Sequence, residues 1–472
     1  MTDKPKRTVL LVAAEFPPIK TIGRIRTVKF VEHMRQHGWQ PVVLTVAVEP
    51  HAGTYDPALE DEIPAGVPVY RVPLVDIEAV LVSKVKRHLH APAPSAPVDA
   101  ASSGASAASN SGTETALPRR LAGGFKSALI MALKGLLKHI VYIPDNYVFW
   151  SGLAAKKAVE ICRSHDIDLV YTSLPPFSSC LVGYKLRKQL GIPWIVDYRD
   201  LWHGDVLREW VGPLRRRVEL FLERRYMKRA DVIVAVSEQK TEYLKKLLPN
   251  APAQRETLTN GYDSDLYEPF LAEPRQPREV IHFVFTGRLF KNRRGYAFAE
   301  ALGQLVREQP ALRDRVRVDI LGGVAPEIRA RYDEILAAYD IASLYSFPGD
   351  IPYREAMRSQ VTADWLLLIV DTGETSDGVI PGKLFEYVAA KRPIFALCDP
   401  GATQTIIERG NLGIVVPAES VNDCRHALAE ILRHPVPETV PVDKAYVERF
   451  DRRLITKRLV DLFGVATART PR

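Results

Sequence analysis

Long apolar runs and a cysteine framework are both missing from this 472-residue sequence, and each absence removes a class of protein. No segment reaches the roughly 18 consecutive apolar residues of a membrane-spanning helix. The first apolar stretch, VLLVAA, is too short for the core of a signal peptide, and EFPP follows it in place of a cleavage site. The four cysteines show neither metal-type nor disulfide-type spacing. We therefore expect a cytoplasmic protein, and peripheral attachment to the inner face of the plasma membrane stays open.

Nucleic-acid and dinucleotide signatures are missing as well. The net charge is +8, but the basic residues are not interleaved with aromatic residues as they are in common RNA-binding modules. Nucleic acid is therefore not an expected partner. Binding to an anionic membrane surface or to a phosphate-bearing substrate explains the positive charge better. A GxGxxG fingerprint is also absent, so Glu49 after the second apolar run does not indicate a nicotinamide or flavin site.

What the sequence does contain is a double series of strand-length apolar runs separated by helix-length segments. The first series extends from RTVLLVAA to ADVIVAVS, and the second from IHFVFTGR to GIVVP. Apolar runs without alternation are typical of parallel strands buried on both faces. The pattern predicts an α/β protein with two Rossmann-like, doubly wound domains facing each other across a cleft. We expect a first domain at 1–270, a linker at 271–280, a second domain at 281–445, and a closing C-terminal helix and tail at 446–472.

Two segments interrupt the first domain. Residues 90–118 are rich in Ala, Ser and Pro, and this composition predicts disorder. Residues 121–143 have helical periodicity, with an apolar stripe beside lysines. That pattern suits a helix on an anionic membrane surface, but it equally suits a helix packed on the domain's own core. The stripe consists of Phe125, Leu129, Leu133, Leu136 and Ile140, next to Lys126, Lys134 and Lys138.

The second domain carries a candidate phosphate site. In DTGETSDGVIPGKLFEYVAAKRPIFAL a polar loop follows a buried-type strand and leads into a helix near Gly382, whose free N–H groups favour a phosphate. Lys383 and Glu386 share one face of that helix, either as a surface ion pair or with Glu386 binding ribose hydroxyls. The loop TGRLFKNRRG supplies Arg288 and Arg294, which suit phosphate oxygens unless the loop is a solvated basic turn.

The first domain carries weaker candidates. Gly23, at the entrance of the first helix, either lets the backbone approach a phosphate or is a plain loop glycine. The run WIVDYRDLWHGD places several polar residues at the end of a strand. They indicate either a functional site or an Asp–Arg pair whose charges satisfy each other. The Asp-x-Asp of NGYDSDLYEP precedes the linker, and we interpret it as a turn in preference to a metal site. The strand-end residues are Asp197, Arg199, Asp200 and His203, and the Asp-x-Asp pair is Asp263 and Asp265.

Taken in order, the motifs AEFPPIKTIG, TSLPPFSS, IPWIVDYRDLW, ADVIVAVSE, LTNGYD, FTGRLFKNRRG and IPGKLFEYVAAKRPI cover almost the whole chain. The sequence resembles a family-four glycosyltransferase of GT-B architecture, of the branch that builds bacterial surface polysaccharides. The resemblance implies an enzyme that transfers a sugar, with retention, from a nucleotide diphosphate donor to a saccharide or lipid-linked acceptor. It implies no metal ion and no cofactor beyond the nucleotide sugar. The residues also leave open a nucleotide-sugar epimerase of the same fold and a catalytically silent nucleotide-binding scaffold.

The resemblance also assigns roles to individual residues. Arg294 replaces the lysine usual in the family, and SDGVIPGK replaces the usual acid-G-F-G, so that Asp377 is the stand-in for the sugar-contacting acid. DYRD stands where many members have a catalytic-site histidine. The implied catalytic residues are Arg288, Arg294, Asp200 and Arg199, and the implied donor-binding residues are Gly23, Arg288, Arg294, Ile380, Gly382, Lys383 and Glu386.

Overall fold

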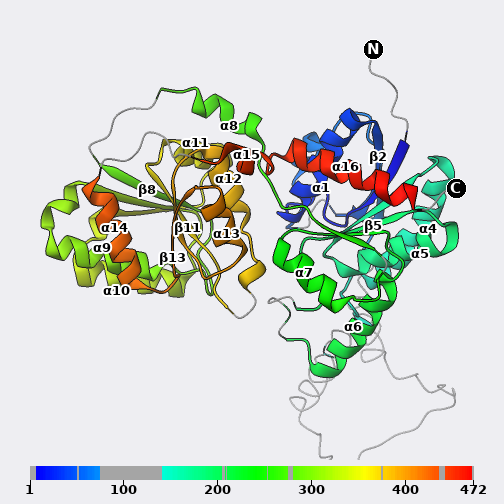
Figure 1. The fold of residues 1–472 in the computed structure, drawn as a ribbon, viewed down its shortest axis with the longest axis horizontal. Helices are drawn as coiled ribbons and strands as arrows, with labels where there is room; N and C mark the ends of the chain where they lie inside the picture. The colour runs from blue at the N-terminus through cyan, green and yellow to red at the C-terminus, as the bar shows by residue number, and fades with distance from the viewer. Residues whose placement is uncertain are drawn as a thin grey trace, which may run out of the picture.

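The computed structural model shows two α/β lobes joined end to end (Figure 1). It describes residues 7–49, 53–74, 135, 141–204, 208, 210–251, 253–274, 280–373, 376–434 and 442–469. The expected disordered insert at 90–118 lies outside the described residues, and so does nearly all of the amphipathic segment at 121–143. No helix in the described ranges is long and apolar enough to cross a membrane.

The first lobe is built on a seven-stranded, all-parallel sheet of order β3-β2-β1-β4-β5-β6-β7. Its inner strands are buried on both faces, as expected from unbroken apolar runs. The last strand was not predicted, because its sequence QRET is polar and it lies at the sheet edge. The strands are β1 (Arg7–Val12), β2 (Trp39–Ala47), β3 (Val69–Pro73), β4 (Leu169–Leu174), β5 (Trp194–Tyr198), β6 (Val232–Ala235) and β7 (Gln254–Thr257).

The helices of the first lobe connect these strands. The helix expected after the first strand is present and is followed by a short 3-10 turn that ends at Gly38, whose φ of 80° is the left-handed conformation that glycine adopts most easily. The helices are α1 (Gly23–Met34), α4 (Val148–Ser164), α5 (Cys180–Leu190), α6 (Pro213–Met227) and α7 (Glu238–Leu247). After β7 the chain enters α8 (Ser264–Leu271), whose Tyr267 and Phe270 pack in a core of the second lobe.

The second lobe has a six-stranded parallel sheet of order β10-β9-β8-β11-β12-β13. All six of its strands were predicted from the apolar runs. Its strands are β8 (Ile281–Thr286), β9 (Val316–Leu321), β10 (Tyr345–Gly349), β11 (Trp365–Ile369), β12 (Ile394–Leu397) and β13 (Gly413–Val416). Its helices are α9 (Tyr296–Glu308), α10 (Pro326–Tyr339), α11 (Tyr353–Thr362), α12 (Gly382–Ala390), α13 (Ala402–Arg409), α14 (Val421–Arg433) and α15 (Lys444–Glu448).

Each sheet separates two apolar cores, one on each face. The chain ends in α16 (Arg452–Ala468), which returns from the second lobe and lies across the first (Figure 1). Phe463 of α16 packs edge-on against Trp39 of β2, with ring centroids 5.0 Å apart. The last helix therefore completes a core of the first lobe. With its two parallel sheets, the structure confirms the predicted architecture of two doubly wound Rossmann-like lobes.

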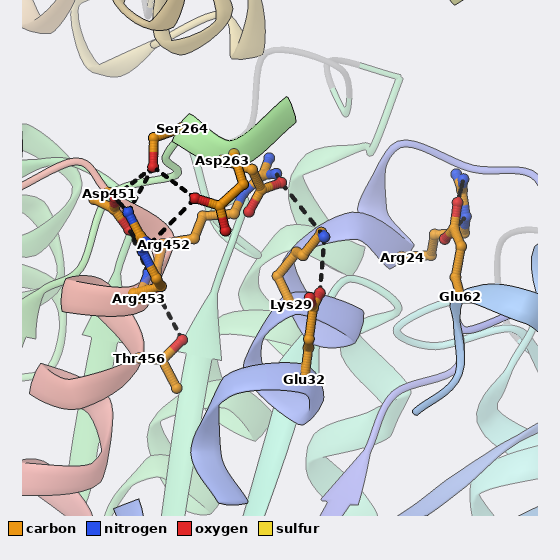
Figure 2. A network of polar contacts seen from close by, with 11 residues as sticks. Arg24, Lys29, Glu32, Glu62, Asp263, Ser264, Asp451, Arg452, Arg453 and Thr456 are labelled. Atoms are coloured by element: carbon orange, nitrogen blue, oxygen red, sulfur yellow. Dashed lines mark hydrogen bonds and ion pairs between the residues drawn. The ribbon is translucent and has the colours of Figure 1, made fainter. Parts of the chain in front are cut away.

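A network of charges joins the start of α16 to the start of α8, where the chain passes between the lobes (Figure 2). Asp263 accepts from Arg452 and lies 3.6 Å from Lys29 of α1. Asp265 lies 3.2 Å from Arg453. Both carboxylates of the Asp-x-Asp motif thus have cationic partners from the protein itself, which gives them a structural function at the crossing between the lobes.

Candidate functional site

In each lobe, polar side chains gather at the point where the strand order reverses. In the second sheet this point lies between β8 and β11, and in the first between β1 and β4. Ligands of doubly wound sheets bind outside the carboxyl ends of the strands at such switch points. The predicted site residues follow these strands or belong to helices that begin beside them.

Arg288 comes directly after β8 and lies over the glycines that follow β9. A Cβ placed on Gly323 would be 3.3 Å from Nε of Arg288, and one on Gly322 would be 1.9 Å from the Gly287 carbonyl oxygen. Gly287 and Gly322 have φ angles of 141° and 136°, so glycine is required for this close packing. Arg288 is exposed, and within the described part of the chain no carboxylate forms an ion pair with it. The strand end therefore presents a cation that is available to an anionic ligand.

Glu386 is held in place by two neighbours. Lys383 donates to its carboxylate at 3.0 Å, and Gln360 of α11 donates to the same oxygen, also at 3.0 Å. Gln360 is fully buried and is itself fixed by Thr286 at the end of β8 and by Tyr267 of α8. Glu386 therefore forms the ion pair with Lys383 and is also held in a fixed position by Gln360. Its carboxylate lies one turn after the start of α12, and that start is the end of the helix that would face a phosphate.

The start of α12 is open above its first residue. A Cβ at Gly382 would meet no atom within 4 Å, and Gly382 is itself exposed. Ile380, two residues earlier, is half-buried against the core beneath. Asp377 lies exposed in the short η8 turn (Ser376–Gly378), whose backbone packs against Gly401.

The two arginines before α9 already have acidic partners. Arg293 pairs with Asp371 beyond β11 at 2.5 Å, while Arg294 is 3.3 Å from Glu419 beyond β13. The side chains of Arg294 and Glu419 are 38% and 56% exposed, so this pair is weak and exchangeable. Arg294 could thus turn to a ligand at low cost, whereas Arg293 is tied to the end of β11.

In the first lobe, Arg199 forms a partly buried ion pair with Glu15, a residue that sequence reasoning did not identify. Their side chains lie 2.7 Å apart, and Arg199 also donates to the carbonyl of Pro175 beyond β4. A Cβ on Gly23 would fall 1.7 Å from the Glu15 carboxylate and 1.8 Å from Arg199. The glycine therefore leaves space for an ion pair above the start of α1, and Glu15 occupies the position that suits an anion.

Asp200 is linked to the opposite lobe through the start of α7. Lys240 donates to the Asp200 carboxylate at 3.2 Å and to the Arg199 carbonyl at 2.9 Å. On the same turn, Ser237 donates across the lobes to the carbonyl of Gly378 at 3.1 Å. The loop before α12 thus contacts the helix turn that holds Asp200, so the structure brings the two predicted halves of the site next to each other.

A cavity of about 480 Å³ adjoins this region on the first lobe. Glu15, Asp200 and Arg208 line it with polar groups. Aromatic rings and prolines form much of the rest, and such flat apolar faces suit the faces of sugar rings. Asp145 lies at the wall, where burial raises its pKa against the opposing effect of hydrogen bonds from Ser178. The apolar lining includes Tyr142, Tyr147, Pro175, Pro176, Phe177 and Trp210.

The structure separates the four polar residues of WIVDYRDLWHGD. Asp197 is fully buried and bound by Arg26 of α1 at 2.7 and 3.1 Å, so the satisfied Asp–Arg pair exists, but with Arg26 in place of Arg199. His203 lies beside Tyr243 at 2.8 Å, and burial lowers the pKa of its ring. Only Arg199 and Asp200 face the region between the lobes.

Comparison with protein families decides the relationship. Residues 23–261, just over half of the chain, match the glycosyl transferase 4-like domain. The chain belongs to this family. Curated relatives include two D-inositol 3-phosphate glycosyltransferases. The one from Kribbella flavida is 25% identical, and the match covers 45% of this chain and 51% of the relative. The one from Saccharomonospora viridis is 23% identical, and the match covers 61% of this chain and 68% of the relative. The chain thus spans about half to two thirds of the length of the curated relatives it matches.

Solved structures place this family member in the GT-B fold. Sucrose-phosphate synthase from Thermosynechococcus elongatus superposes with a TM-score of 0.61 at 16% identity, covering 98% of this chain and all of that one. HepE from Anabaena, solved in complex with UDP, superposes with a TM-score of 0.59 at 14% identity, covering 97% and 99%. At these identities the similarity establishes the fold.

Proposed function

We propose that this protein is a retaining glycosyltransferase that moves a sugar from a nucleotide diphosphate donor to a saccharide or lipid-linked acceptor in surface-polysaccharide assembly. The observation that carries the proposal is the second-lobe switch point. There an exposed Arg288, the open start of α12 and the fixed carboxylate of Glu386 surround one strand end. A cation, free N–H groups and an acid in this arrangement match the diphosphate and the ribose of a sugar nucleotide.

The names of the relatives support this class of substrate. Three curated relatives are D-inositol 3-phosphate glycosyltransferases, and the structural neighbour HepE was solved with UDP and with UDP-glucose. We infer a uridine-type or related nucleotide sugar as donor. The acceptor would bind on the first lobe, in the aromatic cavity beside Asp200.

The proposed chemistry needs no nucleophile from the enzyme. The bond between the anomeric carbon and the donor phosphate oxygen breaks, and a bond to the acceptor oxygen forms on the same face of the sugar. The acceptor hydroxyl gives its proton to the departing diphosphate. Arg288, Arg294 and the start of α12 would stabilise the charge that develops there, and this electrostatic contribution takes the place of a metal ion.

A panel of nucleotide sugars, offered with and without saccharide, lipid-linked and polyol-phosphate acceptors, tests the proposal. Transfer with retention at the anomeric carbon, followed by NMR, is the expected result, with activity nearly unchanged by a chelator. Interconversion of the donor sugar would indicate an epimerase, and binding without turnover would indicate a scaffold. Strict dependence on a divalent ion would contradict the metal-free mechanism.

A further inference from the structure

Helix α6 distributes its ionisable and apolar side chains between its two faces in a different way from an ordinary surface helix. Its inward face carries three ionisable residues, Arg215, Glu219 and Glu223, which are all less than a tenth exposed. Its outward face carries Leu214, Val218 and Phe221, exposed to 75%, 41% and 63%, whereas Leu222, Tyr226 and Met227 pack on the core. A surface helix usually shows the opposite distribution, so this reversal calls for an explanation.

The inward charges fix the orientation of the helix. Glu219 accepts from Arg215 at 2.6 Å, from Arg208 at 2.7 Å and from the indole of Trp202 at 3.0 Å. Glu223 accepts from Tyr198 at 2.9 Å. A rotation that buried the apolar face would leave these groups without partners, which costs more than the exposed apolar surface.

The outward face also has one sign of charge. It consists of Leu214, Arg217, Val218, Phe221, Arg224 and Arg225, which form a continuous strip along the helix, and we call this strip the outer face of α6. Both acidic residues of α6 lie on the buried side, so the strip is apolar and purely cationic. Trp210, 45% exposed, extends it beyond the start of the helix.

We propose that the outer face of α6 docks on the surface of an anionic lipid membrane. Apolar side chains flanked by arginines match the acyl boundary and the anionic headgroups of such a surface. A second copy of the same face fits poorly, because it would bring like charges together. The helix lies on the side of the first lobe away from α16 (Figure 1), so docking there leaves the crossing between the lobes unobstructed.

The position of Trp210 connects this surface to the site. Trp210 belongs to the wall of the 480 Å³ cavity beside Asp200, and it also lines a second hollow together with Arg217 of the outer face of α6. A lipid-linked acceptor held at the membrane would therefore reach the cavity over a short path. This last step rests on the proposed function, whereas membrane docking itself does not depend on catalysis.

Flotation of the full-length protein with vesicles tests the docking directly. We expect binding to vesicles that contain anionic phospholipid, little binding to phosphatidylcholine vesicles, and release as salt rises. Arg217→Gln/Arg225→Gln should weaken binding about 25-fold, since each arginine contributes about five-fold. Leu214→Ser/Val218→Ser/Phe221→Ser should weaken it about ten-fold or more through lost apolar contact.

Matched variants on other surfaces provide the controls. Arg317→Gln/Arg331→Gln changes the net charge equally on the second lobe, and Leu190→Ser/Leu266→Ser/Leu454→Ser removes three exposed apolar side chains elsewhere on the surface. Both should float like the wild type, and thermal unfolding should show that every variant is folded. Wild type that stays in the soluble fraction at low salt overturns the proposal. The proposal is also overturned if the matched control variants lose as much vesicle binding as the α6 variants. It is overturned as well if the protein binds no vesicles but self-associates, and the α6 variants abolish that self-association.

Discussion

Helices α6 and α12 follow strands of the two lobes, yet they use their residues in opposite ways. α12 buries Leu384, Phe385 and Val388 and leaves its two charged side chains at the surface near its start. α6 buries its acids with Arg215 and exposes Leu214, Val218 and Phe221. Charges on α12 are therefore available to a ligand, whereas the buried charges on α6 hold the helix in place.

This difference shows that whether a charged residue contributes to stability or to ligand binding depends on the partner that it already has within the protein. Glu219 has three donors from the protein, and its loss leaves Arg208 and Arg215 without a carboxylate partner. Arg288, by contrast, has an exposed side chain beside an open helix start. Variants of the first kind should change stability, and variants of the second kind should change binding.

The largest effect is expected from Glu219→Ala. Removing this carboxylate leaves Arg208 and Arg215 buried without their partner, and we expect a loss of about 3–5 kcal/mol in the free energy of unfolding. Chemical denaturation measures it. The control is Glu334→Ala, which breaks an exposed pair with Arg331 and should cost no more than about 0.5 kcal/mol. Equal effects in the two variants would remove the distinction between the buried and the exposed face.

The second prediction concerns the pH dependence of stability. Burial raises the pKa of Glu223 to about 8 from an ordinary 4.5, so the folded protein keeps a proton that the unfolded chain releases in this window. Stability should fall as pH rises from 5 to 8, by about 1.4 kcal/mol per pH unit relative to Glu223→Gln. Denaturation of both proteins across this range measures the difference. Parallel pH profiles would show that Glu223 is charged in the folded state.

The third prediction addresses the ligand side of the comparison. Arg288→Ala should weaken binding of the nucleotide donor by roughly 1.5–3 kcal/mol through a lost charge-assisted hydrogen bond, and Glu386→Ala should weaken it through lost ribose contacts. Calorimetric titration with the donor measures both. Arg317→Ala, another exposed arginine of the same lobe, serves as the control and should bind normally. Unchanged affinity in both site variants would reject the donor site at α12.

The smallest effect should come from the outer face of α6. Phe221 is mostly exposed, so Phe221→Ser should change the free energy of unfolding by no more than about 0.5 kcal/mol. Val388→Ser on α12, where the side chain is 7% exposed, should cost more than about 1 kcal/mol. Denaturation of the two variants side by side gives the comparison. A greater loss from Phe221 would mean that α6 buries its apolar face in solution.

Much of the fold could be predicted from the local pattern. Twelve strands were predicted, and the inner ones among them are apolar runs, because strands buried on both faces require such runs. The polar edge strand β7 was not, since its residues gain little from burial. The start of α12, with Gly382 and Glu386, was recognised because a strand, a polar loop and an amphipathic helix follow one another in the sequence.

The partners of the charged residues could not be predicted. Glu15 and Arg199 are 184 positions apart, and Arg26 and Asp197 are 171 apart, so no local spacing connects them. Gln360 gave no signal either, because its function in holding Glu386 appears only when α11 lies beside α12. Such contacts depend on how strands are ordered in the sheets, which periodicity alone does not reveal.

The sequence by itself determined which segments form strands and helices, because burial on both faces of a sheet demands continuous apolar residues and helix starts demand their own local chemistry. The tertiary structure decided which charges were neutralised inside the protein and which stayed available. That decision also set the orientation of α6, since a buried carboxylate needs donors that only distant segments can supply, and Leu214, Val218 and Phe221 were left facing outward as a result.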